Sequence, residues 1–458
     1  MIGIHDAVVE ECATGVPLGA YAGADAANYL FLRASGAYAH SHPLGSERRL
    51  RAVSATVPLF SWDEREMAQD WDVRFDGLPD ERPLHARDGV MPAAHVVHGE
   101  GVMQFVVGPV HAGIIEPGRF TFSSGGETIV HLDAQLGYAH RGVERALGGL
   151  LPLDAARKVA RICGGCSASR SFAYARAIEA LADFAPEQPV DLARLILAEL
   201  ERIYNHLADL AASAAGAAYV VGFTRGMTLK ERVMRLCHAT AGHRLLFDAI
   251  APGGLGRPVL EDRPGFAAEL AALERDVNAY LGTLFGNASM ISRWERAGIL
   301  SQSTAKFHGA VGPALRGSGG LHDVRTFAPY GAYRWLPPVV ASATSGDSLA
   351  RCAVKRDELR ESFSLIVRAL SALGESAIAP QRSLQAQPGI AYGVVEGPRG
   401  TECVAVHVDN DGKLERVHVI AASYRNWPLV TLAMKGNIVP DFPLVNKSFN
   451  LCYACADR

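Results

Sequence analysis

Two Cys-x-x-Cys pairs stand far apart in the sequence. Cys163 and Cys166 lie in "RICGGCSASR", and Cys452 and Cys455 lie in "NLCYACADR". Two thiolates separated by two residues on a tight turn can bind one metal ion, and the two glycines inside the first pair free the backbone to bend. Four sulfur ligands favour zinc, nickel or an iron–sulfur centre over magnesium or calcium. The spacing therefore predicts a metal site built from both pairs.

Two simpler interpretations of the cysteines can be compared with this one. A structural zinc ribbon normally keeps its two pairs about 15–20 residues apart, whereas here a large part of the chain separates them. A thioredoxin-like redox pair needs a βαβ context, which neither motif has. Arg161, Arg170 and Arg458 lie near the cysteines in sequence and would lower the pKa of the thiols. A four-thiolate zinc protein remains as an alternative.

Composition limits the classes of protein to consider. The chain has 458 residues, 49% of them hydrophobic and 20% charged, and its net charge is −3. This balance is typical of a globular protein and gives no basic excess for binding nucleic acid. Residues 1–30 lack the pattern of a signal peptide, so the sequence predicts a cytoplasmic protein with reduced thiols. The apolar stretch "LADLAASAAGAAYVVGFTRG" contains Asp209 and Arg225, which indicates a buried helix rather than a membrane span.

The pattern of residues predicts an α+β fold in two parts. Residues 1–95 are expected to form a small α+β domain, with strands in "NYLFLRA" and "LRAVSATVPLF" and a helix in "SWDEREMAQDWDV". Residues 100–458 are expected to form a mainly helical domain with short β-sheets at its periphery. The cysteine pairs belong to this second domain.

Individual elements of the second domain follow from local signals. "GRFTFSSGGETIVHLDA" predicts a β-hairpin with its turn at the paired glycines, and "ECVAVHVDNDGKLERVHVIAAS" predicts another that turns at "NDG". A helix is expected from Asp191, as its N-cap, to Leu210, and further helices within residues 228–250, 265–285 and 347–374.

Three further motifs, together with the cysteine pairs, resemble a known family. "GPVHAGIIEPGRF", "LGYAHRGVE" and "EGPRGT" are similar to segments of the large subunit of group 4 [NiFe] hydrogenases. These are energy-converting enzymes of the formate hydrogenlyase type, homologous to the 49 kDa subunit of respiratory complex I. The resemblance runs from about residue 100 to residue 458. Residues 1–95 resemble, more loosely, the 30 kDa subunit of complex I.

The resemblance implies a Ni–Fe centre and a role for each cysteine. Cys163 and Cys452 would be terminal ligands of nickel. Cys166 and Cys455 would bridge nickel to an iron ion that carries carbon monoxide and cyanide ligands. The chain has no further cysteine cluster, so an iron–sulfur cluster is expected only on a partner subunit.

Three residues are expected to take part in catalysis. Heterolytic cleavage of hydrogen needs a base beside the metal, and Cys452 is the candidate. Glu116 matches the family's proton-relay glutamate, with a solvated loop carboxylate as the alternative. Arg399 matches the arginine that lies over the open metal position, with a turn arginine paired to Glu396 as the alternative.

Several other polar residues are expected to be structural. His111 aligns with a histidine that contacts quinone in the complex I relatives, but a site-shaping role is favoured here. Glu144 is expected to cap a helix or form an ion pair, and His206 and His243 are expected to be satisfied histidines on helices.

The chain departs from the family at three places. Arg170 stands where the family usually has histidine, Asn450-Leu451 stand where it has Asp-Pro, and Arg458 stands where many members end in a metal-binding histidine. These changes leave the four cysteines intact and alter the groups around them.

Taken together, the resemblance implies the catalytic large subunit of a membrane-associated [NiFe] hydrogenase complex, which evolves or oxidises hydrogen. Its expected partners are an Fe–S small subunit with a [4Fe–4S] cluster, integral-membrane antiporter-like subunits, and a formate dehydrogenase or another electron-donor module. The expected location is the cytoplasmic face of the inner membrane. The alternative is a complex I-like NADH:quinone oxidoreductase component that forms a quinone site or a coupling scaffold without hydrogenase activity.

Overall fold

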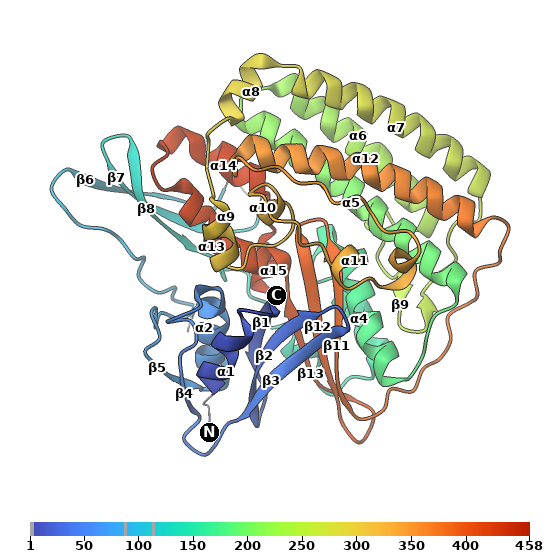
Figure 1. Ribbon diagram of the computed structural model, residues 1–458, viewed down its shortest axis with the longest axis horizontal. Helices are drawn as coiled ribbons and strands as arrows, with labels where there is room; N and C mark the ends of the chain where they lie inside the picture. The colour runs from blue at the N-terminus through green and yellow to red at the C-terminus, as the bar shows by residue number, and fades with distance from the viewer. Residues whose placement is uncertain (1–3, 87–88, 112–114) are drawn as a thin grey trace.

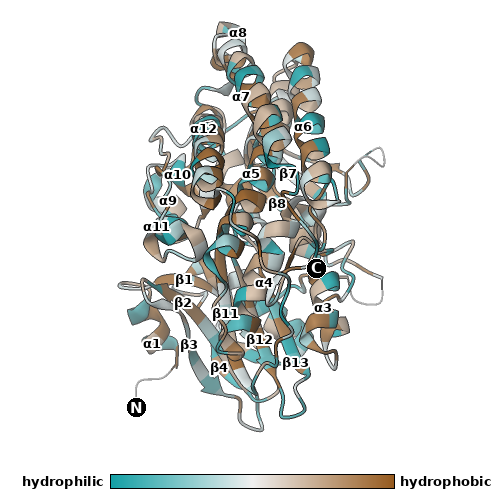
Figure 2. Ribbon diagram, turned by 90° about the vertical axis from the view of Figure 1, so that its right-hand side faces the viewer, coloured by the Kyte–Doolittle hydropathy of each residue, from teal (hydrophilic) through white to brown (hydrophobic). Residues whose placement is uncertain are grey.

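The computed structural model describes residues 4–86, 89–111 and 115–458 and confirms an α+β fold. A bundle of long helices lies at one end of the molecule, the sheets formed by residues 16–43 and 389–420 lie at the other, and the sheet of residues 102–135 extends to one side (Figures 1 and 2). The end of the chain lies between these two parts, beside the N-terminal sheet and its helix α2 (Figure 1).

The N-terminal part is a three-stranded antiparallel sheet with two helices. Its elements are α1 (Ile4–Glu11), β1 (Val16–Ala22), β2 (Ala26–Arg33), β3 (Gly36–Pro43), β4 (Arg49–Arg51), α2 (Ser61–Trp71) and β5 (Arg74–Asp76). Alternate residues of β2 point to opposite faces of the sheet. Tyr29 and Phe31 pack with Phe60 in a small local core, whereas Leu30 and Leu32 join the large core of the rest of the chain. The N-terminal part is therefore attached through a buried sheet face.

The central part combines a three-stranded sheet with the helical bundle. The sheet contains β6 (Val102–Val107), β7 (Arg119–Gly125) and β8 (Thr128–Gln135). The helices are α3 (Pro152–Val159), α4 (Ser167–Leu181), α5 (Gln188–Gly216), α6 (Val220–Ala241), α7 (Arg263–Phe285), α8 (Ala288–Trp294), α9 (Gln302–Phe307), α10 (Gly312–Arg316), α11 (Val324–Phe327) and α12 (Ser348–Leu373), with a small ladder of β9 (Ile250–Ala251) and β10 (Gly254–Leu255). The β7–β8 hairpin confirms the prediction for that segment.

The last part returns to β-structure and then to short helices. It contains β11 (Gly389–Gly397), β12 (Gly400–Val408), β13 (Leu414–Ile420), α13 (Ala422–Met434), α14 (Phe442–Phe449) and α15 (Tyr453–Asp457). β12 pairs with β13 as the "NDG" turn predicts. None of the helices in the described ranges combines the length and the apolar character that crossing a bilayer requires.

Helix α5 is the centre of the bundle, because it is buried almost all round and packs against α4, α6, α12 and α14. An apolar helix that is covered on every side belongs in a core. Residues of several elements therefore meet along α5, including polar ones that have no access to water.

Three sequence-based predictions about local structure were wrong. The stretch predicted as one buried helix is broken at Ala217–Tyr219 between α5 and α6, and Val220 and Val221 are each 67% exposed. Asp191 lies in the first turn of α5, whose N-cap is Glu187, because Pro189 allows the helix to begin earlier. "LRAVSATVPLF" contributes only β4 to a strand, followed by turns and a 3₁₀ helix.

Candidate metal centre

The first cysteine pair lies on the turn between α3 and α4. Cys163 has an extended backbone, and its sulfur accepts a hydrogen bond from the Gly165 N–H at 3.3 Å. A short 3₁₀ turn then leads to Cys166, which is the N-cap of α4. The positive end of the α4 dipole therefore lies beside the Cys166 sulfur. The hydrogen bond with Cys163 lowers the pKa of Cys166, but the hydrogen bond with Cys455 and burial outweigh it, and the pKa lies well above its ordinary value.

The second pair lies between α14 and α15. α14 ends at Asn450, which has a left-handed backbone (φ 48°), a conformation that asparagine tolerates better than most residues. The Cys452 N–H then donates to Ser423 Oγ at 3.0 Å, and the Trp427 indole donates to the Cys452 carbonyl at 3.3 Å. These contacts with α13 fix the start of α15, which carries Cys455.

The four sulfur atoms meet in one buried cluster. Cys163 Sγ lies 3.1 Å from Cys452 Sγ, and Cys166 Sγ lies 3.8 Å from Cys455 Sγ. The sulfurs of Cys163, Cys452 and Cys455 all lie within 4.8 Å of one another, and none of the four cysteines forms a disulfide in the structure. The first members of the two pairs thus face each other, as do the second members. Four soft donors at this separation fit a thiolate-bound metal centre.

The thiols of Cys163, Cys166 and Cys452 hold their protons tightly in this environment. The pKa of Cys163 lies well above its ordinary value, mainly because of the hydrogen bond with Cys166, and also because of Cys452 and burial. Around Cys452, the hydrogen bond with Cys163 lowers the pKa, but Cys455 and burial outweigh it and the net shift is upward. A metal ion that binds here must displace these protons, so its affinity rises with pH.

Arg399 is buried beside the cluster and does not pair with Glu396, so the alternative interpretation of this arginine was wrong. Its Nε donates to the Asn450 carbonyl at 2.6 Å, and its Nη1 donates to Asn205 Oδ1 at 2.9 Å and lies 3.9 Å from Cys166 Sγ. Burial lowers the pKa of Arg399, but Asp209 and the neighbouring sulfurs raise it further, so the guanidinium stays charged. A fixed positive charge therefore lies next to the sulfur atoms.

The backbone of Arg399 is held by a close approach of two loops. Gly312 has φ 62°, and a side chain at this position would collide with the Arg399 carbonyl. Only glycine combines this left-handed backbone with such close packing. The turn before β12 is therefore fixed by α10, at the far side from the cysteines.

Asp209 was not expected to have a role at the site, yet it orients Arg399. Its Oδ1 lies 3.5 Å from Arg399 Nη2 and accepts a hydrogen bond from Asn450 Nδ2 at 2.5 Å, and its Oδ2 lies 2.8 Å from Lys355 Nζ. Burial raises the pKa of Asp209, but Lys355 and Arg399 lower it more, so the carboxylate is ionised. This chain has Asn450 where the family has an aspartate, and here the Asp209 carboxylate on α5 lies beside Arg399.

Arg170 occupies the other side of the cluster. Its Nη2 donates to Glu402 Oε2 at 2.6 Å and lies 3.5 Å from Cys455 Sγ. Its Nη1 is buried and has no hydrogen-bond partner in the described structure. The cluster therefore lies between two buried guanidinium groups, which offset the negative charge of thiolates.

Glu116 lies at the surface of the second cysteine turn. Its Oε2 accepts a hydrogen bond from the Ala454 N–H at 2.5 Å, and Ala454 lies between Cys452 and Cys455. Burial of the carboxyl raises the pKa of Glu116, although the bond from Ala454 opposes this. A carboxylate with an easily retained proton, exposed to solvent beside the site, suits proton exchange.

The remaining histidines and Glu144 have structural contacts. His111 Nε2 donates to the Gly118 carbonyl at 2.8 Å, directly before β7. Glu144 accepts from His418 Nδ1 at 3.0 Å and pairs with Arg458, which confirms the ion-pair interpretation. His206 donates to Glu358 at 2.8 Å inside the bundle, whereas His243 follows α6 rather than lying on it.

Glu201 on α5 supports the first cysteine turn from behind. Its carboxylate accepts hydrogen bonds from Ala168 N at 2.6 Å, Ser169 N at 3.0 Å and Ser169 Oγ at 2.6 Å, so it satisfies the first turn of α4. Burial raises the pKa of Glu201 from 4.5 to about 7. The folded protein therefore holds this proton more tightly than the unfolded chain does.

This shift predicts a dependence of stability on pH. The contribution of Glu201 is full below pH 4.5 and is lost as the pH rises through about 7, so the free energy of unfolding should fall by up to about 3 kcal/mol over this range. Urea unfolding of the metal-free protein at about pH 5 and about pH 8 measures the change. In Glu201→Gln the change should be smaller by that amount, and an equal change in both proteins would contradict the assignment.

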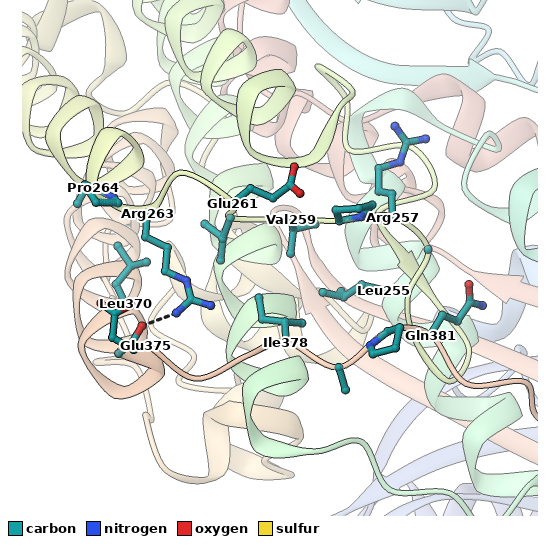
Figure 3. A pocket seen from close by; sticks show the side chains of 17 residues that line it. Leu255, Arg257, Val259, Glu261, Arg263, Pro264, Leu370, Glu375, Ile378 and Gln381 are labelled. Carbon is teal, nitrogen blue, oxygen red and sulfur yellow. Dashed lines mark hydrogen bonds between the residues drawn. The ribbon is translucent and has the colours of Figure 1, made fainter.

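A large cleft lies elsewhere in the structure. It has a volume of about 1030 Å³ and runs between residues 255–264 and residues 370–381 (Figure 3). Leu255, Val259 and Ile378 form its apolar floor, and Arg263 crosses it to donate to the Gly374 carbonyl. None of the four cysteines is among the residues that line this cleft.

Comparison with known proteins adds independent information. The sequence matches the family described as the 49 kDa subunit of respiratory-chain NADH dehydrogenase over residues 217–386 and 378–458. Formate hydrogenlyase subunit 5 of Escherichia coli (strain K12) is 27% identical over 435 residues, which cover 89% of this chain and 76% of the relative. The carbon monoxide-induced hydrogenase of Rhodospirillum rubrum is 29% identical over 356 residues, which cover 77% of this chain and 98% of the relative. An NADH-quinone oxidoreductase subunit of Herpetosiphon aurantiacus is 28% identical over 367 residues, which cover 78% of this chain and 98% of the relative.

Proposed function

Because this chain belongs to the family of the 49 kDa subunit of respiratory-chain NADH dehydrogenase, we propose that it is an oxidoreductase subunit of the hydrogenase branch. Several of the relatives that it matches over most of its length are named as hydrogenases or as a formate hydrogenlyase subunit. The observation that carries the proposal is the meeting of four sulfur atoms from segments almost 300 residues apart, since 289 residues separate the partners of each close pair. A scaffold that only holds other subunits together has no physical need for four converging thiols.

The four cysteines would hold a nickel ion and an iron ion. Cys163 and Cys452, whose sulfurs face each other at 3.1 Å, would be the terminal ligands of nickel. Cys166 and Cys455, which face each other at 3.8 Å, would also hold the iron ion, which would carry carbon monoxide and cyanide ligands. When bound, this centre supplies an electrophilic site that polarises hydrogen and takes up its electrons.

The residues of this chain would manage the proton and the charge. Cys452 is half-buried and would accept the proton that is released when hydrogen is split. Arg399, whose fork is fixed by Asn450, Asn205 and Asp209, would present its charge to the substrate without moving. A preorganised charge of this kind stabilises a polarised transition state more strongly than a mobile one.

Glu116 would connect the site with solvent. Its carboxyl group contacts the backbone of the turn that carries Cys452 and Cys455, and its side chain reaches the surface. A proton that leaves Cys452 could therefore pass to water by way of Glu116. The raised pKa of Glu116 helps it to hold a proton in transit.

The electrons would leave through a partner. We propose an Fe–S small subunit with a [4Fe–4S] cluster as the immediate acceptor or donor, and a formate dehydrogenase or a similar module beyond it. Integral-membrane antiporter-like subunits would hold the complex on the cytoplasmic face of the inner membrane. The names of the relatives, which include a membrane-bound hydrogenase subunit of Pyrococcus furiosus, support this arrangement.

Isotope exchange tests the proposal without any knowledge of the physiological electron donor. The complex is purified from its native host and incubated with deuterium gas in ordinary water, and the formation of HD is followed by mass spectrometry. We expect HD formation that carbon monoxide inhibits. Protein that contains nickel and iron but forms no HD would contradict the hydrogenase function and favour the coupling scaffold.

A further inference from the structure

A buried cluster of charges joins the N-terminal part of the chain to the end of α15. Glu66 on α2 is 7% exposed, and Arg458, which directly follows α15, is 3% exposed. Glu144, which directly precedes the short 3₁₀ helix Arg145–Leu147, and His418 on β13 complete the cluster. Four groups that can each carry a charge, three of them buried and Glu144 half-buried, therefore meet where three separate parts of the chain join.

The guanidinium of Arg458 makes most of the contacts in this cluster. It donates to Glu66 Oε2, to Glu144 Oε1 at 3.1 Å and to the Val419 carbonyl at 2.8 Å, and it lies over the Tyr424 ring at 4.6 Å. Tyr424 in turn donates its hydroxyl to Glu66 Oε2 at 3.0 Å. Buried carboxylates that face each other need a cation between them, and here the chain itself supplies it.

Three groups of this cluster lie close enough together to be compared with a metal site. Single atoms of Glu66, Glu144 and His418 lie within 4.8 Å of one another, a spacing that could suit a metal ion. The Arg458 guanidinium bonds directly to both of these carboxylates. The cluster is thus a closed ion-pair network.

The segment that carries Cys455 depends on this network. α15 has five residues, which is too short for a helix to be stable by its own hydrogen bonds. Its far end is held by the Asp457 carboxylate, which accepts from Gly137 N at 2.7 Å and Ala139 N at 2.9 Å, and by Arg458. Among these contacts, the bond between Arg458 and Glu66 is the one whose partner lies in the N-terminal part of the chain.

We propose that Glu66 is a positioning residue, by which the N-terminal part of the chain latches Arg458 and holds Cys452 and Cys455 closed over the sulfur cluster. The significance of the latch for a metal centre rests on the proposed function, but the latch itself is a property of the folded chain. Loss of the Glu66 charge leaves Arg458 with one carboxylate partner. The cysteine turn then opens more often, whether or not metal is bound.

Thiol alkylation of the metal-free protein tests the latch directly. Cys455 has no exposed surface, so iodoacetamide reaches it only when the segment opens, and the half-buried Cys452 becomes more accessible in the same event. Mass spectrometry of peptides gives the rate for each cysteine separately. In Glu66→Gln, we expect Cys452 and Cys455 to react about tenfold faster than in the original chain, which corresponds to about 1.4 kcal/mol. Cys237 and Cys352, which are buried in α6 and α12, should react at unchanged rates.

Two variants separate the latch from a general loss of stability. Glu64→Gln is the matched control, because Glu64 is a buried carboxylate of the same helix that bonds only to Tyr29, Val53 and Ser54 within the N-terminal part. It should leave Cys452 and Cys455 protected. In the double variant that carries Arg458→Gln and Glu66→Gln, Cys452 and Cys455 should react no faster than in the faster of the two single variants. Both substitutions remove the same ion pair.

The outcomes distinguish this inference from the proposed function. Equal alkylation rates in Glu66→Gln and the original chain would overturn the latch. A parallel increase at Cys452, Cys455, Cys237 and Cys352 would overturn it as well. Either result would leave the hydrogenase proposal untouched. Absence of nickel from the native protein would remove the hydrogenase function, whereas selective exposure of Cys452 and Cys455 would still establish the latch.

Discussion

Replacement of Cys455 by alanine is expected to abolish hydrogen activity and to remove nickel and iron together. Cys455 lies at the centre of the cluster, with no exposed surface, 3.8 Å from the Cys166 sulfur and 3.5 Å from Arg170. In the proposed centre Cys455 binds both ions, so its loss should weaken the binding of both. Metal content measured by mass spectrometry, together with HD formation, gives the two results on one sample.

The fold of Cys455→Ala should survive, which makes the loss interpretable. Removal of one buried sulfur costs about 1–2 kcal/mol of unfolding free energy, a fraction of what a chain of this size can lose. Cys237→Ala on α6 is the matched control, because this thiol is equally buried but lies outside the cluster. Activity retained in Cys455→Ala, or lost equally in Cys237→Ala, would refute the role of Cys455 as a ligand.

Replacement of Arg399 by lysine is expected to slow turnover by about 100- to 1000-fold at unchanged metal content. Lysine keeps the positive charge but lacks the planar fork that contacts Asn450, Asn205 and Asp209 at once. Its ammonium group can also lose its proton when buried beside the cluster. Turnover per bound nickel, rather than per protein, is the quantity to measure.

Arg161→Lys provides the comparison for this variant. Arg161 lies two residues before Cys163, but its guanidinium is partly exposed and pairs with Asp248 at 2.6 Å, away from the sulfurs. This substitution should leave turnover within a factor of about two, since surface ion pairs contribute little. Equal turnover in Arg399→Lys and Arg161→Lys would contradict the proposed part of Arg399.

The sequence predicted those features that depend on local spacing. The two Cys-x-x-Cys pairs indicated a shared site because sulfur ligands at that spacing have few other uses, and the structure brings their sulfurs together. The β7–β8 hairpin and the β12–β13 turn were predicted because glycine and asparagine mark such turns directly. The helices of the bundle followed from apolar periodicity, which α5, α7 and α12 retain.

Features that depend on distant contacts could not be predicted in the same way. Asp209 contacts Arg399 only because α5 and the β11–β12 turn pack together, and the sequence contains no measure of that distance. One signal was available, since Glu199, Arg202, Asn205 and Asp209 recur at a spacing of three or four residues along α5. A polar stripe on a helix that is buried all round indicates a network inside the protein.

The break between α5 and α6 illustrates a different limit. Alanine-rich residues 211–218 have high helix propensity, so local preference favours one continuous helix. The chain leaves the helix at Ala218, which has a left-handed backbone (φ 60°), and Gly216 just before it lies against the backbone of Leu444 in α14, where a larger residue would not fit. Packing against α14 therefore overrides propensity at this point.

Metal analysis of the complex purified from its native host tests the central claim most directly. The claim is that the sulfurs of Cys163, Cys166, Cys452 and Cys455 together hold one nickel and one iron ion. We expect about one equivalent of each metal per chain, in addition to the iron of the partner's cluster. Zinc in place of nickel, at one equivalent per chain, would contradict the account and leave a structural zinc site in its place.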